Sequence, residues 1–189
     1  MKNLILVLLL AGCSVGVNLK TPWSHLDVAY SLLGYSEKTH VKELKSFMGI
    51  NPRRTEWCAA FVNKVLETSG YDSVDTLNIG NPLLAKSYLK YGDMVLESEL
   101  QKGDILIFRR GSEWWQGHVG FYVGTEIVRG RKYYRVLGGN QDNEVNISLY
   151  PEYKLLGIRR ISYEVEDKTH PKSSKENKGI WALTDYLEV

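Results

Sequence analysis

The hydrophobic pattern of the chain changes at Lys102-Gly103-Asp104-Ile105-Leu106-Ile107-Phe108, residues 102–108. Before this point apolar residues recur at helical spacing, and after it they follow period two between Gly, Asn and Pro turns. The pattern predicts helices over 24–33, 41–48, 56–68 and 82–91. It predicts strands over 105–108, 118–123, 133–137, 145–149 and 155–161. Helices followed by a meandering antiparallel sheet indicate an α+β fold, with the N-terminal helices packed on the sheet.

Composition sets the broad class of the chain. Of its 189 residues, 43% are hydrophobic and 24% are charged, which is typical of a globular domain. A net charge of +2 without a run of Lys or Arg argues against nucleic-acid binding. We find no zinc-like Cys or His spacing and no glycine-rich phosphate loop, so we expect no metal and no cofactor. We expect a monomer.

The N-terminus has the features of an export signal. Lys2 precedes a short apolar run over 4–11, and small residues follow at Gly12-Cys13-Ser14. The run is too short for a permanent membrane-spanning helix. Leu10-Ala11-Gly12-Cys13 resembles the bacterial lipobox, in which the cysteine is lipidated. We therefore expect a lipoprotein signal over 1–12, a lipidated Cys13 and a membrane anchor facing the cell wall or periplasm; an ordinary cleaved signal and a buried helix are the alternatives.

The remaining cysteine, Cys58, lies in the segment Glu56-Trp57-Cys58-Ala59-Ala60-Phe61-Val62. Its spacing to Phe61, Val62 and Val65 places it on the apolar stripe of a helix, which favours a small buried side chain. Its place in the first turn favours a different role, because a helix N-terminus stabilises a thiolate and can bind an oxyanion. An exported protein with one free thiol either buries it or uses it.

A histidine and an asparagine complete a possible constellation. His118 opens the strand Gly117-His118-Val119-Gly120-Phe121-Tyr122-Val123-Gly124, and Asn140 follows a later strand in Gly138-Gly139-Asn140-Gln141. Taken singly, such residues are usually structural, since a strand histidine often only packs and an Asn after Gly-Gly often marks a turn. Together with Cys58 they match the parts of a thiol hydrolase: a nucleophile, a general base and an orienting amide.

These segments resemble the NlpC-type cell-wall peptidases and the related CHAP amidases. The resemblance rests on Trp-Cys-Ala-Ala-Phe-Val at 57–62, Lys-Gly-Asp-Ile at 102–105, the His118 strand and Gly-Gly-Asn-Gln at 138–141. It covers roughly residues 23–160 in the expected order, and it is closest to a compact branch common in phage and bacterial genomes that shares the Gly-Gly-Asn-Gln ending. It implies a papain-like fold in which the helix bearing Cys58 packs on an antiparallel sheet bearing His118 and Asn140.

The resemblance also implies an activity and a set of roles. The substrate is the peptide part of peptidoglycan, cut at an amide bond within the stem or cross-bridge, or between stem and sugar. Cys58 is then the nucleophile, His118 the general base and acid, and Asn140 the orienting residue. The chain departs from the family pattern at two positions close to the proposed catalytic residues. Gly138 stands where CHAP enzymes often carry a glutamate, so the third role rests on Asn140 or Gln141. Glu56 stands where a neutral residue is common, and a carboxylate there would raise the pKa of the thiol.

The remaining predictions concern substrate contacts, domain boundaries and the activity of the chain. Trp114 and Trp115 are candidate substrate-binding residues at an aromatic rim, although packing of a hairpin tip explains them equally well, and Gln141 is a further substrate-binding candidate. Arg109 and Arg110 are candidate partners for substrate carboxylates, although charges at a strand end are usually only solvated. We expect a linker over 13–22, the hydrolase domain over 23–162 and a charged tail over 163–189. The chain is predicted to be a peptidoglycan endopeptidase, or an N-acetylmuramoyl-L-alanine amidase, of bacterial or phage origin. The alternative is a non-catalytic muropeptide-binding or virion-structural protein that retains the fold.

Overall fold

The computed structural model describes residues 24–161, which form an α+β domain. The α-helices are α1 (His25–Ser31), α2 (Val41–Met48) and α3 (Cys58–Thr68). The strands are β1 (Asp93–Met94), β2 (Ile105–Arg109), β3 (Gly117–Val128), β4 (Arg131–Gln141), β5 (Glu144–Pro151) and β6 (Leu155–Arg160). The predicted signal segment, the linker with Cys13 and the charged tail lie outside the described residues.

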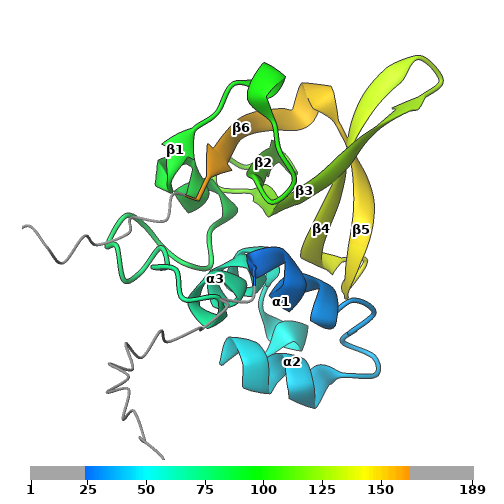
Figure 1. The fold of residues 1–189 in the computed structure, drawn as a ribbon. Helices are drawn as coiled ribbons and strands as arrows, with labels where there is room; N and C mark the ends of the chain where they lie inside the picture. The colour runs from blue at the N-terminus through cyan, green and yellow to red at the C-terminus, as the bar shows by residue number, and fades with distance from the viewer. Residues whose placement is uncertain (1–23, 162–189) are drawn as a thin grey trace, which may run out of the picture.

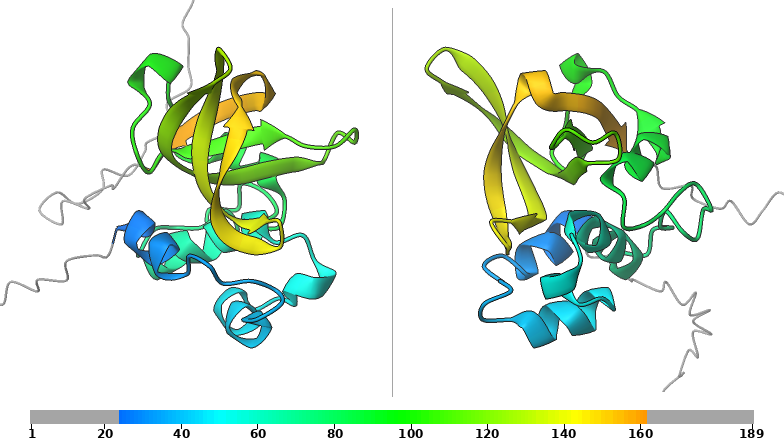
Figure 2. Two further views of the ribbon diagram at one scale, coloured as in Figure 1. Left: turned by 90° about the vertical axis from the view of Figure 1, so that its right-hand side faces the viewer. Right: turned by 180° about the vertical axis from the view of Figure 1, so that it is seen from behind.

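The strands form one antiparallel sheet in the order β1-β6-β2-β3-β4-β5. Figure 1 and Figure 2 show this sheet on one side of the molecule and the three α-helices on the other. The predicted α+β class, with N-terminal helices against an antiparallel sheet, is confirmed at this level. No helix within residues 24–161 is long and apolar enough to cross a membrane.

The centre of the sheet, at β2, is buried on both faces. Ile105 and Ile107 of β2 belong to the core between the sheet and α3, whereas Leu106 and Phe108 belong to a second apolar cluster on the opposite face. All four side chains are fully buried. This explains why β2 is a continuous apolar run, since a strand covered on both faces does not need alternating polar residues.

The predicted start of the first helix and both predicted ends of the second are confirmed, whereas α1 ends at Ser31, two residues before the predicted end. Ser24 caps α1 with a capping box, because its Oγ accepts from the backbone N–H of Asp27 while the Asp27 carboxylate accepts from the Ser24 N–H. Gly49 ends α2 in the left-handed conformation, with φ of 73°, which glycine adopts without a steric cost. Each end therefore follows from a residue type visible in the sequence.

The α-helix predicted over 82–91 was wrong in kind, and the strands predicted over 118–123, 133–137 and 145–149 were too short. Residues 85–90 form a 3-10 helix rather than an α-helix, after the Asn81 side chain accepts from the Leu83 N–H in a local turn. The β3–β4 hairpin extends as far as Val128 and Arg131, beyond the predicted strand ends. The added part of β3 is largely exposed, including Ile127, so it lacks the alternation of buried and exposed residues on which the prediction relied. The two-residue strand β1 was not predicted.

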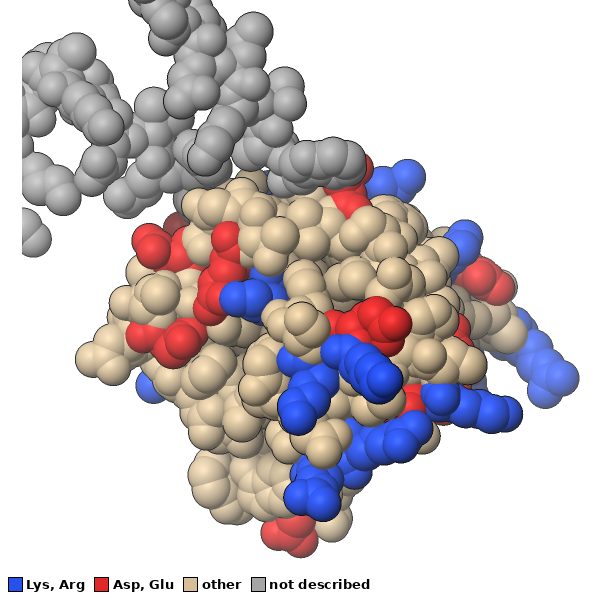
Figure 3. All heavy atoms as spheres, turned by 90° about the horizontal axis from the view of Figure 1, so that it is seen from below, with Lys and Arg blue, Asp and Glu red and all other residues tan. Residues whose placement is uncertain are grey.

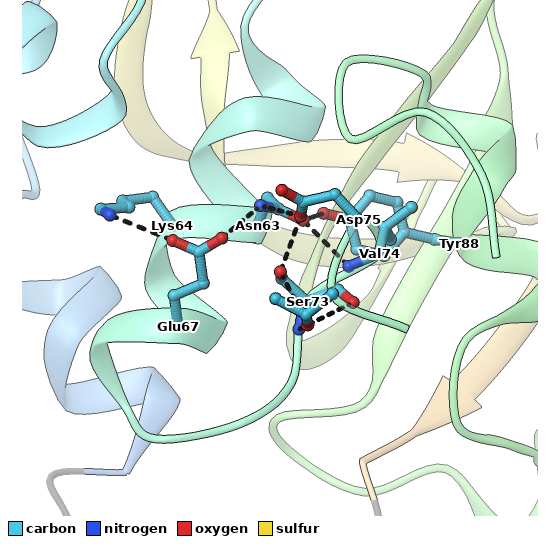
Figure 4. A network of polar contacts seen from close by, with 8 residues as sticks. Asn63, Lys64, Glu67, Ser73, Val74, Asp75 and Tyr88 are labelled. Atoms are coloured by element: carbon cyan, nitrogen blue, oxygen red, sulfur yellow. Dashed lines mark hydrogen bonds and ion pairs between the residues drawn. The ribbon is translucent and has the colours of Figure 1, made fainter. Parts of the chain in front are cut away.

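A buried polar network joins α3 to the loop that follows it (Figure 4). Asn63, on α3 and 8% exposed, donates to Glu67 and to Asp75 at 2.9 and 3.2 Å. Its oxygen accepts from the backbone N–H of Val74 at 3.1 Å and from the Tyr88 hydroxyl at 3.4 Å. This one amide therefore fixes the loop, and the 3-10 helix that carries Tyr88, against the helix that begins at Cys58.

We predict that Asn63→Ala lowers the free energy of unfolding by about 2–3 kcal/mol, because it leaves the Val74 N–H buried without a partner. Lys64→Ala, on the same helix, is the matched control. It removes only a partly exposed ion pair with Glu67 and should cost under about 1 kcal/mol. Urea unfolding of both variants measures the difference, and equal losses would show that Asn63 does not secure the loop.

Candidate functional site

Cys58 is the first residue of α3 and is 4% exposed. Trp57, the residue before the helix, is fully buried and donates its indole N–H to the Glu37 carboxylate at 2.8 Å. Gly139 of β4 packs so closely on this corner that a Cβ there would lie 2.5 Å from the Trp57 ring and 2.7 Å from Phe61. The start of α3 is thereby fixed against the end of β4, in line with the sequence expectation for the Cys58 helix.

Burial raises the pKa of the Cys58 thiol above its ordinary value. The N–H groups of Val119 and Ala59 and the positive charge of Arg110 act in the opposite direction, whereas Glu56 adds to the increase. Burial is the largest of these effects, so the helix N-terminus does not by itself produce a thiolate. The contribution of the Val119 N–H also places the sulfur beside the residue that follows His118.

His118 lies near the start of β3 and is completely buried. Its ring stacks on Tyr150 of β5, with centroids 4.6 Å apart and planes 5° apart. Tyr150 in turn stacks on Phe108. The plane of the imidazole is therefore fixed by aromatic packing, and no pattern in the sequence indicated Tyr150 as its neighbour.

The side-chain amide that contacts His118 belongs to Gln141. Gln141 Oε1 lies 3.0 Å from His118 Nε2. Three oxygens surround the Gln141 amide nitrogen: Val136 O at 3.1 Å, Asn146 O at 2.6 Å and Asn146 Oδ1 at 2.9 Å. Since all three are acceptors, the nitrogen must face them and Oε1 must face the histidine. His118 therefore carries its proton on Nε2, and Nδ1 is left as an acceptor.

Asn140 lies elsewhere, and the reason is a local irregularity in β4. The register between β4 and β5 shifts between Gly138 and Gln141, and Asn140 has a φ of 56°. In a regular strand Gly138 and residue 140 would face the same side, whereas this bulge brings Gln141 to the histidine side instead. A Cβ on Gly138 would lie 3.2 Å from Gln141 Oε1 and 3.4 Å from His118 Nε2, so the glycine leaves room for the amide. Of the two residues considered for the orienting role, the described geometry brings Gln141 to His118 and not Asn140.

Asn140 instead contacts Glu56 at the entrance to the helix. Its Nδ2 donates to Glu56 Oε2 at 2.7 Å, and Arg110 Nη1 lies 3.3 Å from the same oxygen. Both charged side chains are at least half exposed, so the ion pair contributes little to stability. Glu56 stands where the family that the sequence resembles commonly carries a neutral residue, and its charge raises the pKa of the Cys58 thiol. Its two partners reduce that effect.

A cavity of about 300 Å³ opens onto Cys58. Its walls combine apolar side chains, among them Leu83, Leu84 and Trp115, with the charged pair Glu56 and Arg110. Trp115 therefore lies where a substrate-binding residue was predicted, whereas Trp114 is 79% exposed and is not part of this lining. The cavity has the mixed polarity that binding a peptide requires.

His118 does not line this cavity, and it makes no hydrogen bond to Cys58 in the described structure. Its Nδ1 is buried without a partner there. Burial lowers the pKa of His118 to about 4; the hydrogen bond that His118 Nε2 donates to Gln141 opposes this decrease, and the charge of Arg110 adds to it. The site at rest thus holds a neutral imidazole near a neutral thiol, and catalytic hydrogen bonds often tighten only when substrate binds.

Among residues 24–161, no group of three or more His, Cys, Asp or Glu side chains is arranged to hold a metal ion. No family model matches the chain, and no curated protein matches it at a significant level. The functional interpretation therefore rests on the residues and their geometry.

We predict that nitrogen NMR will show His118 as the Nε2–H tautomer. Gln141→Met, which keeps the volume but removes the acceptor, should abolish that preference. The matched control is Asn140→Gly, because glycine tolerates the positive φ at this position while the amide is lost. A tautomer that changes in the control and persists in Gln141→Met would assign the orienting role to Asn140.

We also predict that His118 makes the folded protein less stable in mild acid. Its pKa is about 4 when folded, below the ordinary value near 6.5, so between these values only the unfolded state takes up the proton. Stability is unaffected by this group above pH 6.5 and falls by about 3 kcal/mol as the pH drops to 4. Urea unfolding of His118→Gln should show a shallower dependence on pH. Parallel curves for the two proteins would contradict the low pKa.

Proposed function

We propose that the chain is a papain-like cysteine hydrolase that cleaves an amide bond in the peptide part of peptidoglycan. One observation carries this proposal: Gln141 holds His118 with Nδ1 free as an acceptor, while the Cys58 thiol at the start of a buried helix interacts with the backbone N–H of Val119, the residue after His118. A histidine that only filled the core would not need an orienting amide that is itself held by three acceptors. Endopeptidase activity is favoured, and N-acetylmuramoyl-L-alanine amidase activity uses the same residues.

Each side chain has a defined role in the proposed reaction. His118 Nδ1 takes the thiol proton as Cys58 sulfur adds to the carbonyl carbon, and the backbone N–H of Cys58 donates to the resulting oxyanion. The imidazolium then gives its proton to the amine as the C–N bond breaks, which leaves a thioester. Water, deprotonated by the same nitrogen, hydrolyses the thioester and restores the thiol. Gln141 keeps the proton on Nε2 throughout and accepts a hydrogen bond from the imidazolium.

For the location and the origin of the protein, the proposal rests on the N-terminal sequence alone. A lipidated Cys13 would anchor the enzyme in a bacterial membrane, from which it reaches the wall, and the owner could be a bacterium or a phage. A non-catalytic muropeptide-binding or virion-structural role is the second candidate. The absence of a direct Cys58–His118 hydrogen bond within the described residues, together with the raised pKa of the thiol, favours that candidate.

We predict that the purified full-length chain, kept in mild detergent, releases soluble peptides from isolated peptidoglycan, and that Cys58→Ala lowers the rate by roughly a thousandfold or more. Mass spectrometry of the products identifies the bond that is cut. Cys13→Ser, which removes the only other cysteine of the chain, is the matched control and should keep full activity on isolated peptidoglycan. If neither wild type nor control releases products while circular dichroism shows an intact fold, the non-catalytic role is correct.

A further inference from the structure

A second cavity adjoins the one that opens onto Cys58. It measures about 280 Å³, and Glu56 forms part of the wall of both cavities. Arg54, Asn140 and Asn143 are among the residues that line the second cavity and not the first. Glu56 precedes Cys58 by only two positions, so a peptide with its scissile bond at the thiol can extend past Glu56 into this second cavity.

Most of the charges around the second cavity already have partners. Arg53 donates from Nε and Nη2 to the backbone carbonyl of Glu37, and the Glu37 carboxylate accepts from the Trp57 indole. Glu56 accepts from Asn140 and Arg110. Among the charged residues lining the cavity, only Arg54 has a side chain that makes no hydrogen bond or ion pair within residues 24–161; its backbone N–H donates to the Asn51 carbonyl at 3.0 Å.

The unpaired guanidinium of Arg54 indicates which kind of ligand the cavity can bind. A guanidinium presents a planar set of N–H donors that match a carboxylate in a two-point hydrogen bond. The Asn143 side-chain amide, which also has no partner in the described structure, is a further donor among the residues that line this cavity. Arg110, 3.3 Å from Glu56, offsets the negative charge that would otherwise repel an anion from the shared wall.

The surrounding surface is compatible with an anionic ligand. Arg54 belongs to a 3-10 helix (Pro52–Arg54) that packs on α2, and α2 adds the exposed Lys42 and Lys45. Figure 3 views the molecule from the helical side and shows Lys and Arg side chains gathered over part of this face, with acidic side chains between them. Basic groups of this kind raise the local concentration of an anion but do not select one.

We propose that this second cavity is a carboxylate-binding subsite, in which Arg54 pairs with a free carboxylate of the peptide whose scissile amide lies at Cys58. The inference rests on the proposed hydrolase function and specifies which substrates it prefers: peptides that carry an unblocked carboxylate close to the cleaved bond. Arg54 is a specificity residue in this arrangement, since it touches the substrate at a distance from the reacting atoms.

Paired substrates test the subsite directly. The probes are a peptidoglycan stem peptide whose γ-linked glutamate carries a free α-carboxylate, and the same peptide with that group as the amide. We expect Arg54→Gln to lower kcat/KM for the carboxylate form about tenfold, mainly through KM, and to leave the amide form unchanged. Arg54→Lys should restore part of the loss. The matched control is Arg131→Gln, which makes the same charge change at an exposed position on the β3–β4 hairpin.

Binding to the full-length Cys58→Ala variant separates this proposal from the catalytic one. Calorimetry should show tighter binding of the carboxylate peptide than of the amide peptide, and Arg54→Gln in that background should remove the difference. This result would support the subsite even if wild type cleaves neither peptide, in which case only the hydrolase proposal fails. Equal binding of the two peptides, no binding of either, or equal effects of Arg54→Gln and Arg131→Gln would overturn the subsite.

Discussion

The hydrogen bond between Gln141 and His118 is the constraint on which the rest of the site depends. It exists because β4 is irregular between Gly138 and Gln141, and because Asn146 and the Val136 carbonyl hold the amide nitrogen away from the ring. Without the bulge, a different side chain would face the imidazole. The backbone of the sheet, rather than a flexible side chain, therefore determines which nitrogen of the histidine carries the proton.

An unpaired buried nitrogen is not sufficient evidence for a catalytic histidine, and this chain contains its own comparison. His25 also has Nε2 bonded, to the Gly103 carbonyl at 2.9 Å, and Nδ1 buried without a partner in the described structure. Burial lowers its pKa as well. What distinguishes His118 is a side-chain amide fixed on one nitrogen, an aromatic ring stacked on its face, and the Cys58 thiol near the N–H of the next residue.

The sequence predicted the fold more completely than the site. Helical period, the Ser24 cap and the left-handed Gly49 are local signals, so the first helices follow from them. The choice between Asn140 and Gln141 depends on a register shift between two strands, which alternation along one strand cannot reveal. Tyr150 and Asn146 come from β5, which reaches the histidine only through the pairing of the sheet, and neither has a sequence signal of its own.

The electrostatics of the resting site also limit how the proposed chemistry can begin. A buried thiol with a raised pKa and an imidazole with a lowered pKa do not form a stable ion pair, so proton transfer must accompany attack on the substrate. The positive charge of Arg110 lowers the pKa of both groups, because it favours the Cys58 thiolate and disfavours the His118 imidazolium. A substrate group that binds Arg110 or displaces Glu56 from it would change both pKa values at once.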